Sequence, residues 1–135
     1  MKHRVVSSVL LLALLLPVQA SRADPLVNPA PILVPAGVDQ GTVVKAIKQA
    51  LMYRNWMISA QQPGRIDAKL YLRGNEADIR IDYDGSSVRI AYAGSRGLED
   101  HDEKGVRQIH GRYLVWINYL VGDIDTNLRH SRRQD

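Results

Sequence analysis

The sequence predicts an α+β domain with the element order α-β-β-β-β-α, in which two helices pack on one face of a four-stranded antiparallel meander. Apolar residues alternate with polar ones in four segments between Trp56 and Tyr92, which is the period of half-buried strands. Turn residues separate these segments, and a helical apolar period stands on either side of them. Most of the alternating polar residues are charged, so we expect the second face of the sheet to meet water.

Residues 1–23 have the features of a secretory signal peptide. Basic residues precede an apolar run from Val5 to Leu16, and small residues follow at Ala20 and Ala23. The run is too short to cross a bilayer comfortably, and a short apolar core with an A-x-A-like exit is typical of cleaved signals. Cleavage after Ala20 and cleavage after Ala23 both fit this pattern. We therefore expect a periplasmic mature protein with no transmembrane span.

The charge balance of the mature chain argues against a nucleic-acid partner. Residues 1–23 carry three of the 18 basic residues and none of the 14 acidic ones, so their removal lowers the net charge from +4 to +1 and leaves 112 residues. That length corresponds to one ordinary domain. The chain has no cysteine, which excludes disulfides, thiolate metal sites, a cysteine nucleophile and a lipidated cysteine.

The chain divides into four parts, which are the signal peptide at 1–23, an extended leader at 24–38, one domain at 39–129 and a basic tail at 130–135. The leader holds four prolines, which favour extended backbone. Ile32 to Val34 can lie against the domain, but we favour a flexible spacer.

Two amphipathic helices bracket the strands. The first is expected from Asp39 to Asn55, with Asp39 or Thr42 as its cap. The second is expected from Gly111 to about Arg129, with a broad apolar stripe that includes Trp116 and faces the sheet. The basic residues beyond it are interpreted as a frayed tail.

The turn residues set the expected strand register. Gln62-Pro63-Gly64 predicts a three-residue loop with a bulge in the first hairpin, because the inward residues of both strands must stay in phase. In the second hairpin, a Gly74-Asn75 turn pairs Leu72 with Ala77.

Two registers compete in the third hairpin. A two-residue Asp84-Gly85 turn is the stronger turn signal, but it sets Arg80 opposite Arg89. A four-residue loop from Asp84 to Ser87 sets Asp82 opposite Arg89 instead. The opposite charges favour the longer loop.

Three cations on the exposed face form a candidate ligand site. The register of the second hairpin sets Lys69 opposite Arg80, and Arg89 joins them directly or diagonally. Like charges side by side cost stability, so either diagonal aspartates relieve them or they bind an anion. We favour relief by the aspartates. The alternative function is binding of an anionic envelope ligand, such as a glycolipid, a glycan or a phosphate-bearing molecule.

The strands from Trp56 to Gln61 and from Val88 to Tyr92 are the expected edges of the meander. The outward residues of the first of them, Met57, Ser59 and Gln61, carry no charge. This strand therefore lacks the usual protection against strand addition. We interpret these three residues as a candidate interface for a partner protein or a second copy.

No motif in the sequence specifies a reaction. The histidines are isolated, and no nucleophile elbow, phosphate loop, zinc spacing or dinucleotide fingerprint occurs. Ala93 to Lys104 is expected to be a polar surface loop, whose acidic residues around His101 lack a metal-ligand spacing. Asp67 and Asp82 can form a carboxylate pair, the minimum for sugar hydrolysis, but an open sheet offers no cleft. We expect no catalytic, cofactor or metal site and no enzyme.

A spaced pattern links the chain to a known group of proteins. Its residues are Trp56, Gly64-Arg65-Ile66-Asp67-Ala68-Lys69-Leu70, Arg73, Ile81-Asp82-Tyr83, Ile90-Ala91-Tyr92, Ser95, Leu98, Ile109-His110, Tyr113, Trp116-Ile117, Leu120 and Ile124. Across about residues 43–125, this pattern resembles small exported proteins of Gram-negative bacteria, many of them lipoproteins, with no known activity. The resemblance implies the α-β-β-β-β-α order and an envelope location.

Two departures from that group affect the expectations. The lack of a lipidation cysteine implies a soluble protein instead of an anchored one. Gly111 stands where such proteins often have proline, and His110 before it is expected to be a helix cap or a packed side chain. We therefore expect a non-enzymatic protein-binding or assembly module, whose partner is another envelope protein.

Overall fold

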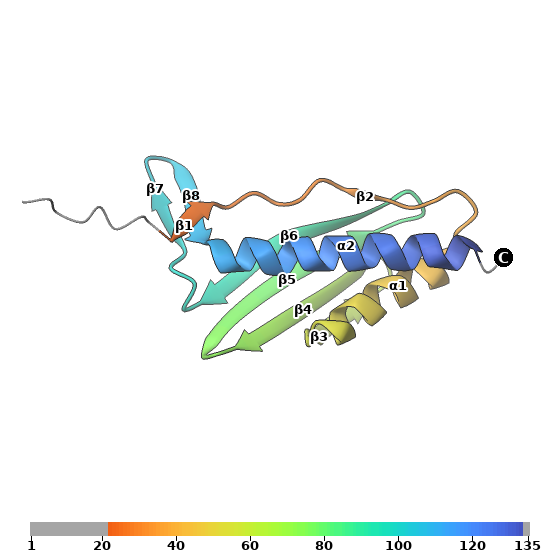
Figure 1. The fold of residues 1–135 in the computed structure, drawn as a ribbon, viewed down its shortest axis with the longest axis horizontal. Helices are drawn as coiled ribbons and strands as arrows, with labels where there is room; N and C mark the ends of the chain where they lie inside the picture. The colour runs from red at the N-terminus through yellow and green to blue at the C-terminus, as the bar shows by residue number, and fades with distance from the viewer. Residues whose placement is uncertain (1–21, 134–135) are drawn as a thin grey trace, which may run out of the picture.

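The computed structural model describes residues 22–133 and has an α+β fold (Figure 1). The expected order of helix, strands and C-terminal helix is confirmed. The strands form a large antiparallel sheet in the order β2-β6-β5-β4-β3 and a small one in the order β1-β8-β7. The elements are β1 (Ala23–Pro25), β2 (Ile32–Leu33), α1 (Gln40–Tyr53), β3 (Met57–Gln62), β4 (Arg65–Leu72), β5 (Asn75–Tyr83), β6 (Ser87–Arg96), β7 (His101–Glu103), β8 (Val106–His110) and α2 (Gly111–Arg133). The expected signal peptide lies outside the described residues, apart from its last two positions.

Both helices lie on the same face of the large sheet (Figure 1), and the apolar core fills the space between the two layers. Ile79 and Ile81 of the central strand β5 are at most 1% exposed. Leu51 of α1 and Leu120 of α2 are fully buried. The period of two in the sequence therefore placed the apolar face of the sheet correctly. No helix among residues 22–133 is long and apolar enough to cross a membrane.

The second hairpin has a different register from the expected one. Its turn residues are Arg73 and Gly74, with φ of 52° and 80°, and Leu72 pairs with Asn75 instead of Ala77. A two-residue turn with positive φ at both central positions has the backbone twist that suits a hairpin, and glycine favours its second position. Gly74 therefore ends the turn instead of beginning it.

The first hairpin has a two-residue turn, Pro63-Gly64, instead of the expected three-residue loop, because Gln62 pairs with Arg65. The expected bulge is present, but it lies within β3, between Ile58 and Ala60. The extra residue that keeps the inward side chains in phase is thus in the strand and not in the turn.

The third hairpin has the longer loop that opposite charges favoured, with Asp82 opposite Arg89. Oδ1 of Asp84 accepts hydrogen bonds from the backbone N–H groups of Ser86 and Ser87 at 2.8 and 2.9 Å. These bonds hold the pKa of the Asp84 carboxyl below its ordinary value. Aspartate begins such loops because its side chain can bind the backbone in this way.

The leader is extended, but the interpretation as a flexible spacer is wrong. Ile32 is buried and pairs with Val88, and the N–H of Val34 donates to the carbonyl of Ser86 at 2.9 Å. The leader thus adds β2 beside β6, so β6 is not an edge strand. Burial of the Ile32 side chain compensates for ordering this segment.

The segment from Ala93 to Lys104 is not one surface loop. β6 continues to Arg96, and β7 and β8 form a hairpin whose turn residues, Lys104 and Gly105, both have positive φ. β1 pairs with β8 to complete the small sheet. The small sheet therefore joins β1 to the strand that leads directly into α2.

The helix caps agree with the sequence. Oδ1 of Asp39 accepts a hydrogen bond from the N–H of Thr42 at 2.7 Å, so Asp39 caps α1. α2 begins at Gly111, and Nδ1 of His110 accepts from the N–H of Arg112 at 3.1 Å, which is the expected capping role of His110. The tail prediction is wrong for residues 130–133, because α2 continues to Arg133.

Candidate functional site

The three cations predicted as a ligand site do not lie side by side. In the observed register, Lys69 is opposite Asp78 and Arg80 is opposite Asp67. Nζ of Lys69 lies 3.1 Å from Asp78 and 3.2 Å from Glu76, and Nε of Arg80 lies 3.0 Å from Asp67. Hydrogen bonds to these carboxylates raise the pKa values of Lys69 and Arg80.

The third cation, Arg89, also has local partners. Its Nη1 donates to Ser87 Oγ at 3.0 Å and lies 3.8 Å from Asp84. Asp67 and Asp82 do not lie opposite each other, because Asp67 is opposite Arg80 and Asp82 is opposite Arg65, whose Nε donates to it at 2.7 Å. The charged face is therefore a ladder of alternating charges with no cationic stripe.

The β3 edge, residues Met57–Gln62, is the outermost strand of the large sheet and pairs only with β4. All six of its residues are exposed, and none is charged or proline. Edge strands usually carry lysine, proline, a bulge or a cover that blocks the addition of another strand, and β3 has a bulge but no charge or proline. Within residues 22–133 the outer row of backbone groups on β3 faces no other strand.

The bulge changes which side chains of β3 share a face. Met57 lies opposite Lys69 on the charged face, as expected, but Gln61 lies opposite the buried Ile66 on the helix side. Ser59 is the residue of the bulge. The expectation that Met57, Ser59 and Gln61 face the same way is therefore wrong, because a bulge inverts the alternation beyond it.

A cavity of about 200 Å³ lies next to the start of β3. We call it the aromatic pocket; its lining residues are Arg54, Asn55, Trp56, Leu70, Tyr71, Leu72, Trp116 and Tyr119. They come from the connection between α1 and β3, from β4 and from α2. Both tryptophans of the chain line this pocket.

The pocket exists because the two helices differ in length. α1 has 14 residues and α2 has 23, which correspond to lengths of about 21 and 34 Å. Figure 1 shows the β4–β5 hairpin extending past the C-terminal end of α1. α2 alone covers this part of the sheet, so Trp116 is only half-buried. The apolar stripe of the sequence predicted that Trp116 faces the sheet, but it did not predict the pocket.

Arg54, the C-cap of α1, holds one side of the aromatic pocket in place. Its Nε donates to Asp123 Oδ2 at 2.7 Å, and its guanidinium lies 4.4 Å from the ring centre of Tyr119 and 5.0 Å from that of Tyr53. The hydrogen bond to Asp123 raises the pKa of Arg54. Stacking of Arg on aromatic rings adds to the ion pair, so this wall is preorganised.

Large apolar side chains are exposed around the pocket. Tyr53 is 74% exposed and Tyr71 is 56% exposed. Leu72 and Tyr119 on the pocket rim are 41% and 50% exposed. Aromatic residues, Met and Arg are the residue types that protein interfaces favour.

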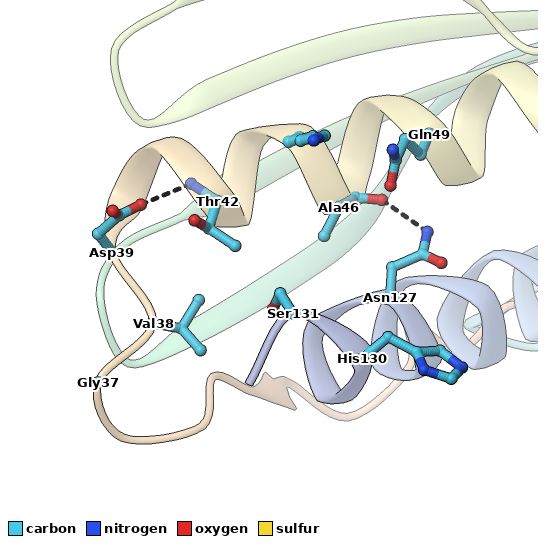
Figure 2. A pocket seen from close by; sticks show the side chains of 10 residues that line it. Gly37, Val38, Asp39, Thr42, Ala46, Gln49, Asn127, His130 and Ser131 are labelled. Atoms are coloured by element: carbon cyan, nitrogen blue, oxygen red, sulfur yellow. Dashed lines mark hydrogen bonds between the residues drawn. The ribbon is translucent and has the colours of Figure 1, made fainter. Parts of the chain in front are cut away.

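A second hollow, of about 360 Å³, lies between the start of α1 and the end of α2 (Figure 2). Two polar side chains of α2 that line it bind their own chain. Nδ2 of Asn127 donates to the carbonyl of Ala46 at 3.1 Å, and Ser131 Oγ donates to the carbonyl of Leu128 at 2.7 Å. Figure 2 shows His130 pointing away from Asp39, so the polar groups do not converge on a ligand.

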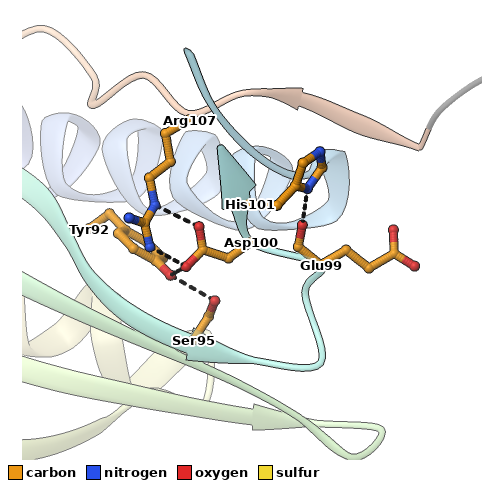
Figure 3. Close-up of polar contacts among 6 residues, drawn as sticks. All are labelled: Tyr92, Ser95, Glu99, Asp100, His101 and Arg107. Carbon is orange, nitrogen blue, oxygen red and sulfur yellow. Dashed lines mark hydrogen bonds and ion pairs between the residues drawn. The ribbon is translucent and has the colours of Figure 1, made fainter. Parts of the chain in front are cut away.

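A polar cluster joins the two sheets (Figure 3). The hydroxyl of Tyr92 donates to Asp100 Oδ2 at 2.8 Å and lies 2.8 Å from Ser95 Oγ. Arg107 donates to Asp100 from Nε at 2.6 Å, which holds the pKa of the Asp100 carboxyl below its ordinary value. Burial raises the pKa of the Tyr92 phenol. Asp100 is thus a structural partner, and among residues 22–133 no group of acidic and histidine side chains has the arrangement of a metal site.

The β3 edge and the aromatic pocket are therefore the surface with the clearest unused binding capacity. Main-chain donors and acceptors lie along the β3 edge, and the aromatic pocket adjoins it. No protein-family model, curated protein or solved structure matches this chain.

Proposed function

We propose that this protein is a non-enzymatic binding module of the bacterial cell envelope that docks an extended segment of a partner protein on β3. The observation that carries the proposal is the position of the pocket beside an uncharged edge strand. Trp56 lines the aromatic pocket, and the next residue, Met57, begins β3. Strand addition gains affinity from main-chain hydrogen bonds and specificity from adjacent side-chain pockets.

The size of the aromatic pocket supports a side chain of the partner as its occupant. Its volume of about 200 Å³ lies below the roughly 300–1,000 Å³ of small-molecule sites. One large apolar side chain, such as Leu or Phe, suits this volume and the aromatic walls. Buried anchors of this kind carry most of the energy of protein interfaces.

The bulge in β3 limits which segments can add to this edge, because bulges are one of the devices that hinder strand addition. A bulge twists an edge strand and interrupts its regular row of backbone groups. The partner segment must therefore match the local twist around Ser59. This distinguishes the β3 edge from a flat strand, on which any extended chain can add.

The proposal includes export to the periplasm. The basic start, short apolar run and small residues of positions 1–23 support it, and the absence of cysteine argues against a lipid anchor. The alternative, an anionic ligand on the charged face, has no observation in its favour, since carboxylates pair with Lys69 and Arg80.

A displayed library of linear peptides, selected against the folded mature protein, tests this function. We expect enriched peptides to share an extended, β-favouring segment with one large apolar residue. Ser59→Lys on the β3 edge should weaken their binding at least tenfold without unfolding the domain, because a charge on the edge opposes strand addition. Asn118→Lys, at an exposed position of α2, should leave binding unchanged. Failure to enrich any peptide, or binding that survives Ser59→Lys, would overturn the proposal.

A further inference from the structure

The aromatic pocket has a hydrogen-bond donor that binds nothing within residues 22–133. Trp56 is only 5% exposed, yet its indole N–H has no hydrogen-bond partner in this part of the chain. The nitrogen is not sealed in, because Asp78 Oδ1 is the only enclosed side-chain N or O atom of residues 22–133 without a partner. A buried indole N–H usually has an acceptor, so this donor is available to a ligand in the pocket that Trp56 lines.

Arg54 supplies a second donor. Its Nε and Nη2 bond to Asp123, whereas Nη1 has no hydrogen-bond partner among residues 22–133. Asp123 does not line the aromatic pocket; it lines a separate hollow together with Tyr53. A guanidinium has five N–H donors in a fixed plane, so the pair with Asp123 orients Arg54 and leaves it able to bind a second acceptor.

The lining of the pocket selects the chemistry of its ligand. None of its lining residues is Asp or Glu, and most of them are aromatic or aliphatic. The ligand therefore needs an apolar body and acceptor oxygens. A carboxylate matches the planar donors of arginine. An ammonium group would face the cation of Arg54 and would find no carboxylate in the lining.

The pocket lies at the point where the β3 edge begins. Met57 is opposite Lys69, and β4 continues past this pair to Leu72. Before Met57 the chain comes from α1 through a turn, with φ of 64° at Asn55. A segment that adds antiparallel to β3 runs toward this end, so its own C-terminus reaches the pocket. A parallel segment would bring its N-terminal ammonium group there instead.

We infer that the partner docks by its C-terminal segment, antiparallel to β3, with a large apolar last residue in the aromatic pocket. Its free α-carboxylate accepts hydrogen bonds from the indole N–H of Trp56 and from Nη1 of Arg54. This inference rests on the proposed function and names the kind of segment that β3 receives. Main-chain pairing alone accepts any extended stretch of chain, whereas a carboxylate site accepts only a chain end.

Two displayed peptide libraries with the same random segment test which part of a chain binds. In one the segment ends in a free carboxylate, and in the other a constant Gly-Ser tail follows it. We expect enrichment from the first library only, with Leu, Phe or another large apolar residue at the last position. Enrichment of the tailed library to the same extent would overturn the inference but leave strand docking intact. Enrichment of neither would overturn the proposed function as well.

The enriched peptide, synthesised as a free acid and as an amide, tests the role of Arg54. Tryptophan fluorescence should show that the amide binds about tenfold more weakly or worse, because it lacks the charge-assisted bonds. Arg54→Gln should reduce this acid-to-amide ratio to about one. Arg129→Gln, at an exposed cation on α2, should leave the ratio unchanged. Equal binding of acid and amide by the natural protein, or equal weakening of both by Arg54→Gln, would overturn the inference.

Discussion

Arg54 and Asp123 join the two helices beside the aromatic pocket through hydrogen bonds of 2.7 Å from Nε and 3.3 Å from Nη2. Because the same guanidinium stacks on Tyr119, this pair fixes the orientation of an aromatic side chain that lines the pocket. The contact ties the C-terminal end of α1 to α2 at the point where α1 no longer covers the sheet. The pair therefore positions one wall of the aromatic pocket as well as packing the helices.

The substitution Asp123→Asn should affect peptide binding more than stability. It removes the charge that holds Arg54, so the pocket wall loses preorganisation, and we expect roughly threefold weaker binding or more. Tryptophan fluorescence can measure this, since both tryptophans line the pocket. Asp125→Asn is the matched control, because it breaks an exposed pair with Arg129 on the same helix. Equal affinity of both variants would contradict the role of Arg54.

Truncation of Trp116 should cost less stability than truncation of Leu120. Leu120 is fully buried, so Leu120→Ala should lower the free energy of unfolding by about 2 to 5 kcal/mol. Trp116 is half-buried at the pocket, and we expect a cost of less than about 2 kcal/mol for Trp116→Ala. Urea melts of the two variants provide the comparison. A larger cost for Trp116→Ala would mean that this side chain is part of the core and does not line an open pocket.

The alternation and turn chemistry of the sequence were enough to predict the central strands and both helices. They were not enough for the second hairpin, where Arg73-Gly74 and Gly74-Asn75 both contain a glycine, and choosing the wrong pair shifted the register. That shift produced the false cationic stripe of Lys69 and Arg80. Strand β2 was missed because two residues are too short to show a period.

The sequence predicted only one of the two parts of the candidate site. The uncharged edge could be predicted, since residues Met57–Gln62 contain no charge. The aromatic pocket could not, because it depends on where α1 ends relative to α2, and its residues come from separate parts of the chain. An apolar stripe at helical spacing gives no sign of which positions the next layer leaves uncovered.

The packing of the leader can be tested at two neighbouring residues, one of which serves as the control. Ile32 is 6% exposed and its neighbour Leu33 is 75% exposed. Ile32→Asp should lower the free energy of unfolding by about 3 kcal/mol or more, because it buries a charge. Leu33→Asp should change it by less than about 0.5 kcal/mol. Similar denaturant midpoints for both variants would mean that residues 24–38 are a spacer after all.

Acid should weaken the junction between the two sheets. The Arg107 hydrogen bond holds the pKa of folded Asp100 below its unfolded value of about 3.9, so the unfolded chain binds the proton more readily. The resulting stability is present above about pH 5 and is lost as the pH falls through the folded pKa. Denaturant melts between pH 7 and pH 3 should show a smaller loss for Asp100→Asn than for the natural protein. Glu103→Gln, at an exposed position on β7, serves as the control, and identical pH profiles for all three proteins would exclude this contribution.

Hydrogen exchange of the β3 amides, with and without a selected peptide, tests the central claim most directly. The β3 N–H groups that bond to β4 should exchange slowly even without peptide, whereas the outward ones face no strand within residues 22–133. Strand addition requires that the peptide slow exchange at these outward amides of Met57–Gln62, while the distant β7–β8 hairpin stays unchanged. A peptide that binds without protecting β3, or that protects only other elements, would contradict docking on this edge.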